Sequence, residues 1–75
     1  MSTFDRIVSV FNKVVPSVDC SNVTMDTVLT SDLGLDSLKM LHMVILLEDE
    51  FGIKLGYDVK LCTVGDVVEW IESKI

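Results

Sequence analysis

Apolar residues recur at steps of three and four along three separate segments of this chain, and this spacing favours amphipathic helices over strands. The first segment follows Thr3, which can cap a helix, and ends before Pro16, which interrupts helical hydrogen bonding. The second segment starts at Asp36 or Ser37, both suited to capping, and ends at Gly52. The stripe of the first segment comprises Phe4, Ile7, Val8, Phe11, Val14 and Val15. These segments predict one helix at the start of the chain and one in its middle.

The third segment predicts a last helix after Thr63, where Asp66 stands in for the usual Glu of a capping box. Its apolar positions are Val64, Val67, Val68, Ile71 and Ile75. Residues 57–61 predict one short turn of helix after an irregular connection. A chain of 75 residues has room for one core, so we expect a single domain over residues 1–75. The predicted fold class is all-α, a small four-helix bundle of three longer helices and one short helix.

A polar loop over residues 17–30 separates the first two predicted helices and is rich in Ser, Thr, Asn and Asp. Scattered apolar residues predict that this loop is pinned onto the core. They are Val18, Val23, Met25, Val28 and Leu29. Loops of this length usually carry some function.

Charge and hydropathy exclude several classes of protein. The net charge of −6 repels the phosphate backbone of nucleic acids, which we do not expect as partners. The longest apolar run, residues 43–47, is far shorter than the roughly 20 residues of a membrane-spanning helix. No secretory signal follows Met1, so we expect a cytoplasmic protein. We expect it to be a monomer in which Cys20 and Cys62 stay reduced and serve as packing residues.

The predicted second helix has two apolar faces. The face expected to lie against the core consists of Met40, Met43, Val44, Leu47 and Phe51. Leu38, Leu41 and Ile45 lie on nearly the opposite side, beside His42 and Asp49. Either this helix is buried all round, or its second face is an exposed docking surface for a partner.

Ser37 lies next to this second face, at the positive end of the predicted helix. Free backbone N–H groups and the helix dipole favour a bound anion such as phosphate there. On this chemistry alone, a serine that follows an aspartate at a helix start is most often an ordinary cap. The motif around it is more specific.

Residues 32–38 read Asp-Leu-Gly-Leu-Asp-Ser-Leu and resemble the prosthetic-group attachment motif of the acyl carrier protein family. The resemblance continues through residues 47–53, at the acidic end of the second helix, and through residues 63–68, which open the last helix. Three motifs in the family's order and spacing cover nearly the whole chain. The resemblance implies a helical carrier in which Ser37 is esterified to 4′-phosphopantetheine taken from coenzyme A.

The same resemblance implies that the chain is not an enzyme but carries acyl groups as thioesters, in fatty acid, lipid or polyketide-type biosynthesis. Asp36 would help present Ser37 to a phosphopantetheinyl transferase and its magnesium site. Leu38, Leu41 and Ile45 would contact acyl-transferring or acyl-processing enzymes. A core able to part around an acyl chain would comprise Val44, Leu47, Val59, Leu61, Val68 and Ile71.

Three acidic residues, Glu48, Asp49 and Glu50, lie near the negative end of the second helix. Each charge there costs about 0.3–1 kcal/mol of helix stability. Local stability therefore does not explain them, which leaves solubility or recognition of basic partner surfaces, with Glu48 as a candidate contact.

Lys39 and His42 stand where fatty-acid carriers typically have acidic residues, and residues 56–62 form a shorter segment than the family usually has. We therefore expect a specialised carrier of an acyl, aminoacyl or polyketide group. A peptidyl or aminoacyl carrier, or a non-covalent acidic interaction module that leaves Ser37 bare, are the alternatives. A hydrolase pair of Ser37 and His42 is not expected, because five helical residues separate them by about 140° around the axis.

Overall fold

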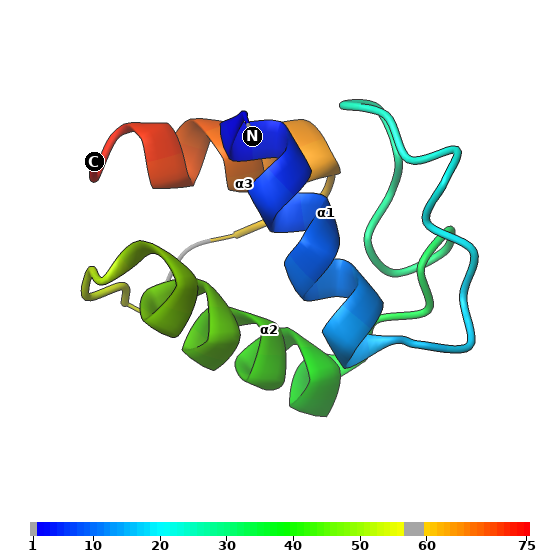
Figure 1. Cartoon of the computed structure of the whole chain (residues 1–75). Helices are drawn as coiled ribbons and strands as arrows, with labels where there is room; N and C mark the ends of the chain where they lie inside the picture. Colours follow the sequence, from blue (N-terminus) through cyan, green and yellow to red (C-terminus); the bar gives the residue numbers. More distant parts are fainter. Residues whose placement is uncertain (1, 57–59) are drawn as a thin grey trace.

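Three helices form the regular structure of this computed structural model, which describes residues 2–56 and 60–75. They are α1 (Thr3–Val14), α2 (Ser37–Phe51) and α3 (Val64–Glu72). Helix α1 packs against both of the others and lies between them (Figure 1). Within the described ranges, an isolated antiparallel bridge joins Val28 to Thr63 but no strand forms, which confirms the all-α class. No helix in these ranges has the length and apolar character needed to cross a membrane.

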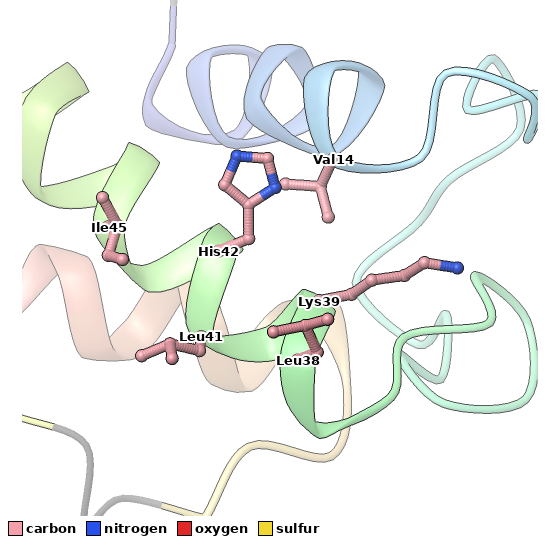
Figure 2. Close-up of a pocket in the computed structure, with 6 residues that line it drawn as sticks. All are labelled: Val14, Leu38, Lys39, Leu41, His42 and Ile45. Atoms are coloured by element: carbon pink, nitrogen blue, oxygen red, sulfur yellow. The ribbon is translucent and has the colours of Figure 1, made fainter.

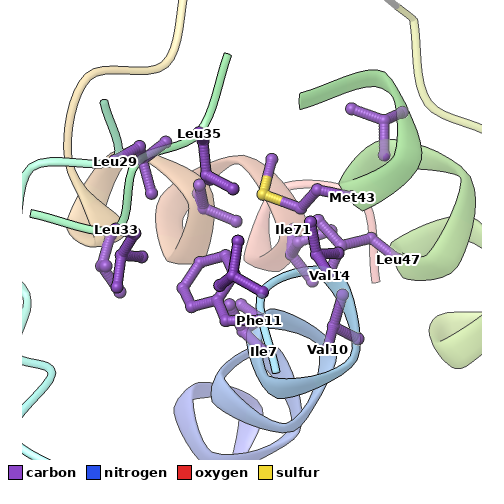
Figure 3. Close-up of a cluster of buried hydrophobic side chains, with 14 of the residues drawn as sticks. Ile7, Val10, Phe11, Val14, Leu29, Leu33, Leu35, Met43, Leu47 and Ile71 are labelled. Carbon is purple, nitrogen blue, oxygen red and sulfur yellow. The ribbon is translucent and has the colours of Figure 1, made fainter. Parts of the chain in front are cut away.

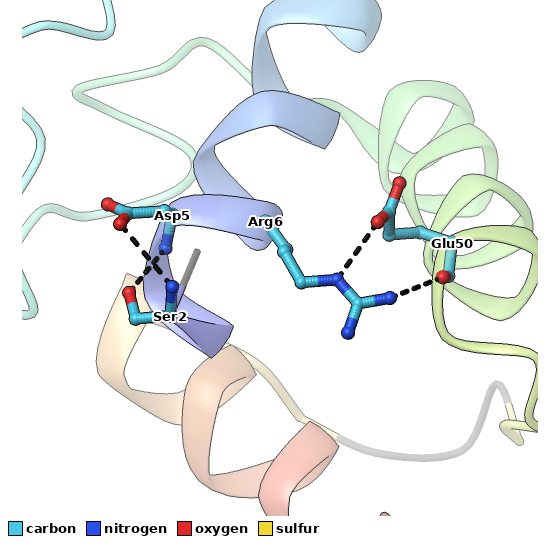
Figure 4. Close-up of polar contacts among 4 residues, drawn as sticks. All are labelled: Ser2, Asp5, Arg6 and Glu50. Atoms are coloured by element: carbon cyan, nitrogen blue, oxygen red, sulfur yellow. Dashed lines mark hydrogen bonds and ion pairs between the residues drawn. The ribbon is translucent and has the colours of Figure 1, made fainter.

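Local hydrogen bonds explain where α1 and α3 begin. The Ser2 hydroxyl accepts from the Asp5 N–H at 3.1 Å, and the Asp5 carboxylate accepts from the Ser2 N–H at 3.5 Å (Figure 4). Thr63 and Asp66 form the same reciprocal capping box at the start of α3, as predicted. The prediction that Thr3 caps the first helix was wrong by one residue, because Ser2 has the extended backbone and the hydroxyl that reaches the first turn.

The carboxyl end of α2 is held by contacts that the sequence did not predict. Gly52 ends the helix in the left-handed conformation, with φ of 64°, as expected. Arg6 donates from Nε to Glu50 Oε2 at 3.0 Å and from Nη2 to the Glu50 carbonyl at 2.7 Å (Figure 4). Glu48 Oε2 accepts from the Leu55 N–H at 2.7 Å. These contacts beyond the helix give the two glutamates a structural role that the sequence alternatives of solubility and partner recognition did not include.

One cluster of buried apolar side chains joins all three helices to the loop. Phe11 of α1 is fully buried there among residues from α2, α3 and the loop (Figure 3). The core face predicted for α2 is confirmed, since its three central residues are buried and Met40 and Phe51 are half-buried. Ile75 is exposed, contrary to its predicted place in the last apolar stripe, because α3 ends at Glu72.

The loop between α1 and α2 is pinned onto the core, as predicted, and is also hydrogen-bonded to the start of α3. The Leu29 N–H donates to the Cys62 carbonyl at 2.9 Å, and the Val64 N–H donates to the Thr27 carbonyl at 2.9 Å. The Leu29 side chain is fully buried. The Met25 side chain is exposed, contrary to expectation, because its backbone carbonyl makes the contact with α3.

The predicted short helix over residues 57–61 falls mostly outside the described residues, which leave out 57–59. Lys60 and Leu61, its last two positions, are not helical. The four-helix count therefore stays a prediction.

Both cysteines are free thiols. Cys20 is buried as predicted, and this burial, together with the charge of Asp19, raises the pKa of its thiol. The Cys62 side chain is exposed, so its prediction as a packing residue was wrong. Its backbone, through the carbonyl that accepts from Leu29, makes the contact instead.

Candidate functional site

A turn closed by Asp32 brings the loop back toward α2. Asp32 Oδ2 accepts from the Val28 N–H at 2.7 Å, and the Asp32 N–H donates to the Val28 carbonyl at 2.9 Å. Three residues later, the Leu35 N–H donates to the Leu29 carbonyl at 3.0 Å. These bonds satisfy the backbone of the turn and fix the path of the chain just before α2.

Two leucines anchor this segment in the core. Leu33 and Leu35 are each only 2% exposed, whereas Gly34 between them is exposed and has φ of +69°. A residue with a side chain would be strained in this left-handed conformation. The two anchors and the glycine turn hold the following residues, Asp36 and Ser37, at the surface.

Ser37 is the first residue of α2, and its side chain is exposed. Asp36 caps the helix: Oδ1 accepts from the Lys39 N–H at 2.9 Å, and the carbonyl accepts from the Met40 N–H at 2.8 Å. Among the described residues, no acceptor takes a hydrogen bond from the N–H of Ser37 or Leu38. Two free donors and the positive end of the helix dipole thus lie beside the Ser37 hydroxyl, which suits a phosphate ester at that oxygen.

Three large apolar side chains are exposed on the outer face of α2. Leu38, Leu41 and Ile45 are 74%, 43% and 48% exposed, so the alternative of a helix buried all round was wrong. An open groove of about 400 Å³ runs along this face (Figure 2). The groove, called the α2 groove below, is lined by Val14, Leu38, Lys39, Leu41, His42 and Ile45.

A second hollow of about 410 Å³ adjoins the α2 groove at Ile45, which lines both. This acidic hollow is lined by Ile45, Glu48, Asp49, Ile53 and Lys54. Glu48, predicted as a partner contact, is half-buried, and its carboxylate already accepts from the Leu55 N–H. Asp49 is exposed.

The structure gathers most of the residues predicted to shelter an acyl chain. Val44, Leu47, Val68 and Ile71 are buried in one core cluster, and half-buried Leu61 packs against it. Val59, the sixth, lies outside the described residues.

Two residues of this region were not singled out as site residues from the sequence. Val14 was assigned to the core and is buried, yet it also lines the α2 groove because the end of α1 packs beside α2. Asp32 closes the turn before the serine motif, a backbone role that aspartate often has in turns. The position of Asp32 directly after Thr and Ser was the sequence signal for this turn role.

Residues 2–56 and 60–75 contain no cluster of His, Cys, Asp and Glu suited to a metal ion.

Comparison with known proteins adds an independent finding. A family model described as a phosphopantetheine attachment site matches residues 5–71. The chain is 40% identical over 74 residues to an acyl carrier protein of Thermotoga maritima, covering 96% of this chain and 90% of that protein. It is 36% identical over 75 residues to one of Helicobacter acinonychis, with 97% and 95% covered. Over 59 residues it is 46% identical to one of an Exiguobacterium species, with 76% and 75% covered.

Proposed function

Because the chain belongs to the acyl carrier protein family, which is defined by a phosphopantetheine attachment site, we propose that Ser37 carries the 4′-phosphopantetheine arm. The observation that carries this assignment is an exposed serine hydroxyl at the first position of α2, beside two free N–H groups. These donors and the helix dipole stabilise the negative charge of a phosphodiester at Ser37 Oγ.

The function is that of an acyl carrier. When bound, the arm supplies a terminal thiol on which acyl groups are held as thioesters. Acyl carrier proteins are carriers and not catalysts, so the work of this chain is to expose Ser37, keep its backbone rigid and present the surrounding surface to enzymes. Leu33 and Leu35 provide the rigidity, since both are buried in the core.

Asp36 has two roles in this proposal. It caps α2 through the Lys39 N–H, which fixes the orientation of the neighbouring serine. Its exposed carboxylate also lies next to the hydroxyl that a phosphopantetheinyl transferase must reach, where it can engage the magnesium site of that enzyme.

Acyl carrier proteins work with transferases and acyl-processing enzymes, and the exposed apolar side chains of α2 are the proposed contacts. Leu38, Leu41 and Ile45 would bury apolar area against such an enzyme. Glu48 would add a charge at the far end of the same face, although its bond to Leu55 ties it partly to the fold.

The core residues around Val44 and Ile71 are the proposed shelter for the acyl chain. An acyl chain that enters the core interacts only with the folded protein and therefore raises the stability of the folded state. The unfolding temperature of the acylated protein should rise with acyl length. An unfolding temperature that is independent of acyl length would place the acyl chain outside the core. The cargo itself is proposed to come from fatty acid, lipid or polyketide-type biosynthesis.

The assignment of Ser37 is tested by incubating the purified chain with coenzyme A and a broad-specificity phosphopantetheinyl transferase. Intact mass spectrometry should show the gain of one phosphopantetheine group. Ser37→Ala should show none, whereas the control Ser31→Ala, which removes a nearby exposed loop hydroxyl, should be modified like the native chain. Modification of Ser37→Ala, or no modification of the native chain by several active transferases, would contradict the proposal.

A further inference from the structure

The first turn of α2 differs from those of the other two helices in its charge. At the third helical position α1 has Asp5 and α3 has Asp66, and each closes a capping box. In α2 this position is Lys39, and the first turn contains no acidic residue. A cation near the positive end of a helix opposes the dipole, so helix stability does not explain Lys39.

The ammonium group of Lys39 is also free to act outside the chain. Among the described residues, the one ion pair joins Arg6 to Glu50, at the opposite end of α2. The polar side chains that line the α2 groove are Lys39 and His42, and no carboxylate lines it. On a chain with a net charge of −6, this groove is therefore a local site without negative charge, beside exposed apolar side chains.

The sign of the charge changes along the same face of α2. Ile45 lines both the α2 groove and the acidic hollow, where Glu48 and Asp49 face a single Lys54. A partner that lies along this face thus meets the Lys39 ammonium and the His42 imidazole on the Ser37 side of Ile45, and mostly carboxylates on the other side.

We propose that this face selects partner enzymes of complementary polarity. Such an enzyme presents a carboxylate to Lys39 and His42, an apolar side chain to the α2 groove, and a basic residue to Asp49. The proposal rests on the proposed function, because the partners are enzymes that act on the group attached to Ser37. Complementary charge fixes the register of docking and rejects partners with like charge. Lys39 and His42 are then specificity-determining residues.

The test is a charge swap with a transferase as the probe. The probe is used in two forms. The first is a phosphopantetheinyl transferase with a basic carrier-binding surface, and the second is the same enzyme with the basic residues that face the start of α2 changed to Glu. Dissociation constants are measured without coenzyme A for the native chain, for Lys39→Glu/His42→Glu and for Lys39→Gln. Lys74→Glu is the matched control, since Lys74 is exposed, lies beyond the end of α3 and lines neither hollow.

The double variant should bind the basic enzyme about five- to tenfold more tightly than the native chain and the swapped enzyme more weakly by a similar factor. For each enzyme, the affinity of Lys39→Gln should lie between those of the native chain and the double variant, and the affinity of Lys74→Glu should equal that of the native chain. Added salt should reduce every difference in affinity. Equal responses of the native chain and the double variant to the swap, or a response of Lys74→Glu as large as that of the double variant, would overturn the proposal. A self-associated dimer in sedimentation, lost in the double variant, would overturn it in favour of a second copy as the occupant.

Loading of Ser37 is followed by mass in parallel samples of the same chains that also contain coenzyme A, which separates the two proposals. If the chain is loaded but its affinities do not respond to the charge swap, the polarity proposal alone is contradicted. If the affinities respond to the charge swap but the chain is never loaded, the assignment of Ser37 is contradicted.

Discussion

The start of α2 and the starts of α1 and α3 are built for different purposes. Ser2 with Asp5, and Thr63 with Asp66, close reciprocal capping boxes that use side chains on both sides of the helix start. Asp36 caps α2 from one side only, and the third helical position, an acid in the other two helices, is Lys39. The difference teaches that α1 and α3 use an acidic side chain to complete their caps, whereas the first turn of α2 leaves a hydroxyl and a cation available to other molecules.

The largest expected effect is a difference in stability between variants of Leu35 and Leu38, which lie on either side of Ser37 in the sequence. Leu35 and Leu38 are three residues apart, but Leu35 is buried and Leu38 is exposed. Leu35→Ala should lower the free energy of unfolding by about 2–5 kcal/mol, because it leaves a cavity in the core. Leu38→Ala should change it by less than about 0.5 kcal/mol while weakening transferase binding. Denaturant unfolding measures the free energy of unfolding of both variants. Similar losses of stability in the two would show that this part of the α2 face belongs to the core.

The next effect compares two caps. Thr63→Ala and Asp36→Ala should each cost about 1 kcal/mol of stability, because each leaves a first-turn N–H without its acceptor. Only Asp36→Ala should also slow the loading of Ser37 by a transferase, since Thr63 lies at the start of α3. Equal loading rates in the two variants would remove the proposed second role of Asp36.

A smaller effect of opposite sign is expected at Lys39. Lys39→Glu should stabilise the chain by about 0.3–1 kcal/mol, because it places a negative charge at the positive end of α2. Lys74→Glu, which makes the same change of charge beyond the end of α3, should give no gain. If both variants have the stability of the native chain, the charge at the start of α2 carries no local cost and that part of the comparison fails.

The smallest effect expected is a pH dependence from the capping box of α3. Hydrogen bonds from the N–H groups of Thr63 and Cys62 hold the pKa of Asp66 below its ordinary value. The ionised carboxylate is therefore favoured in the folded chain. Its contribution to stability is complete above the ordinary pKa of about 3.9 and is lost as the pH falls through the lowered value. Asp66→Asn should flatten the acid limb of stability against pH, and an unchanged limb would show that Asp66 does not contribute to it.

Much of this fold could be predicted from the sequence because its signals are local. The helix ends at Asp36, Gly52 and Thr63 depend on residues within four positions of one another, and so does the capping box at Asp66. Exposure of the outer face of α2 followed from helical periodicity, but only as one of two alternatives.

The parts that could not be predicted depend on distant residues. Arg6 and Glu50 are 44 positions apart, and nothing in the local pattern pairs them. The exposure of Cys62 follows from which of its groups meets the loop, a choice made by tertiary packing. Val14 lines the α2 groove only because the end of α1 packs beside α2, so the sequence placed it in the core alone.

The most direct test of the central claim is the intact mass of this chain isolated from its own cells while its pathway is active, followed by mapping of the modified peptide. The structure predicts a population that carries one phosphopantetheine group, with or without an acyl group on its thiol, attached at Ser37. A chain whose Ser37 is always unmodified under those conditions would contradict the account and leave only a small acidic helical protein.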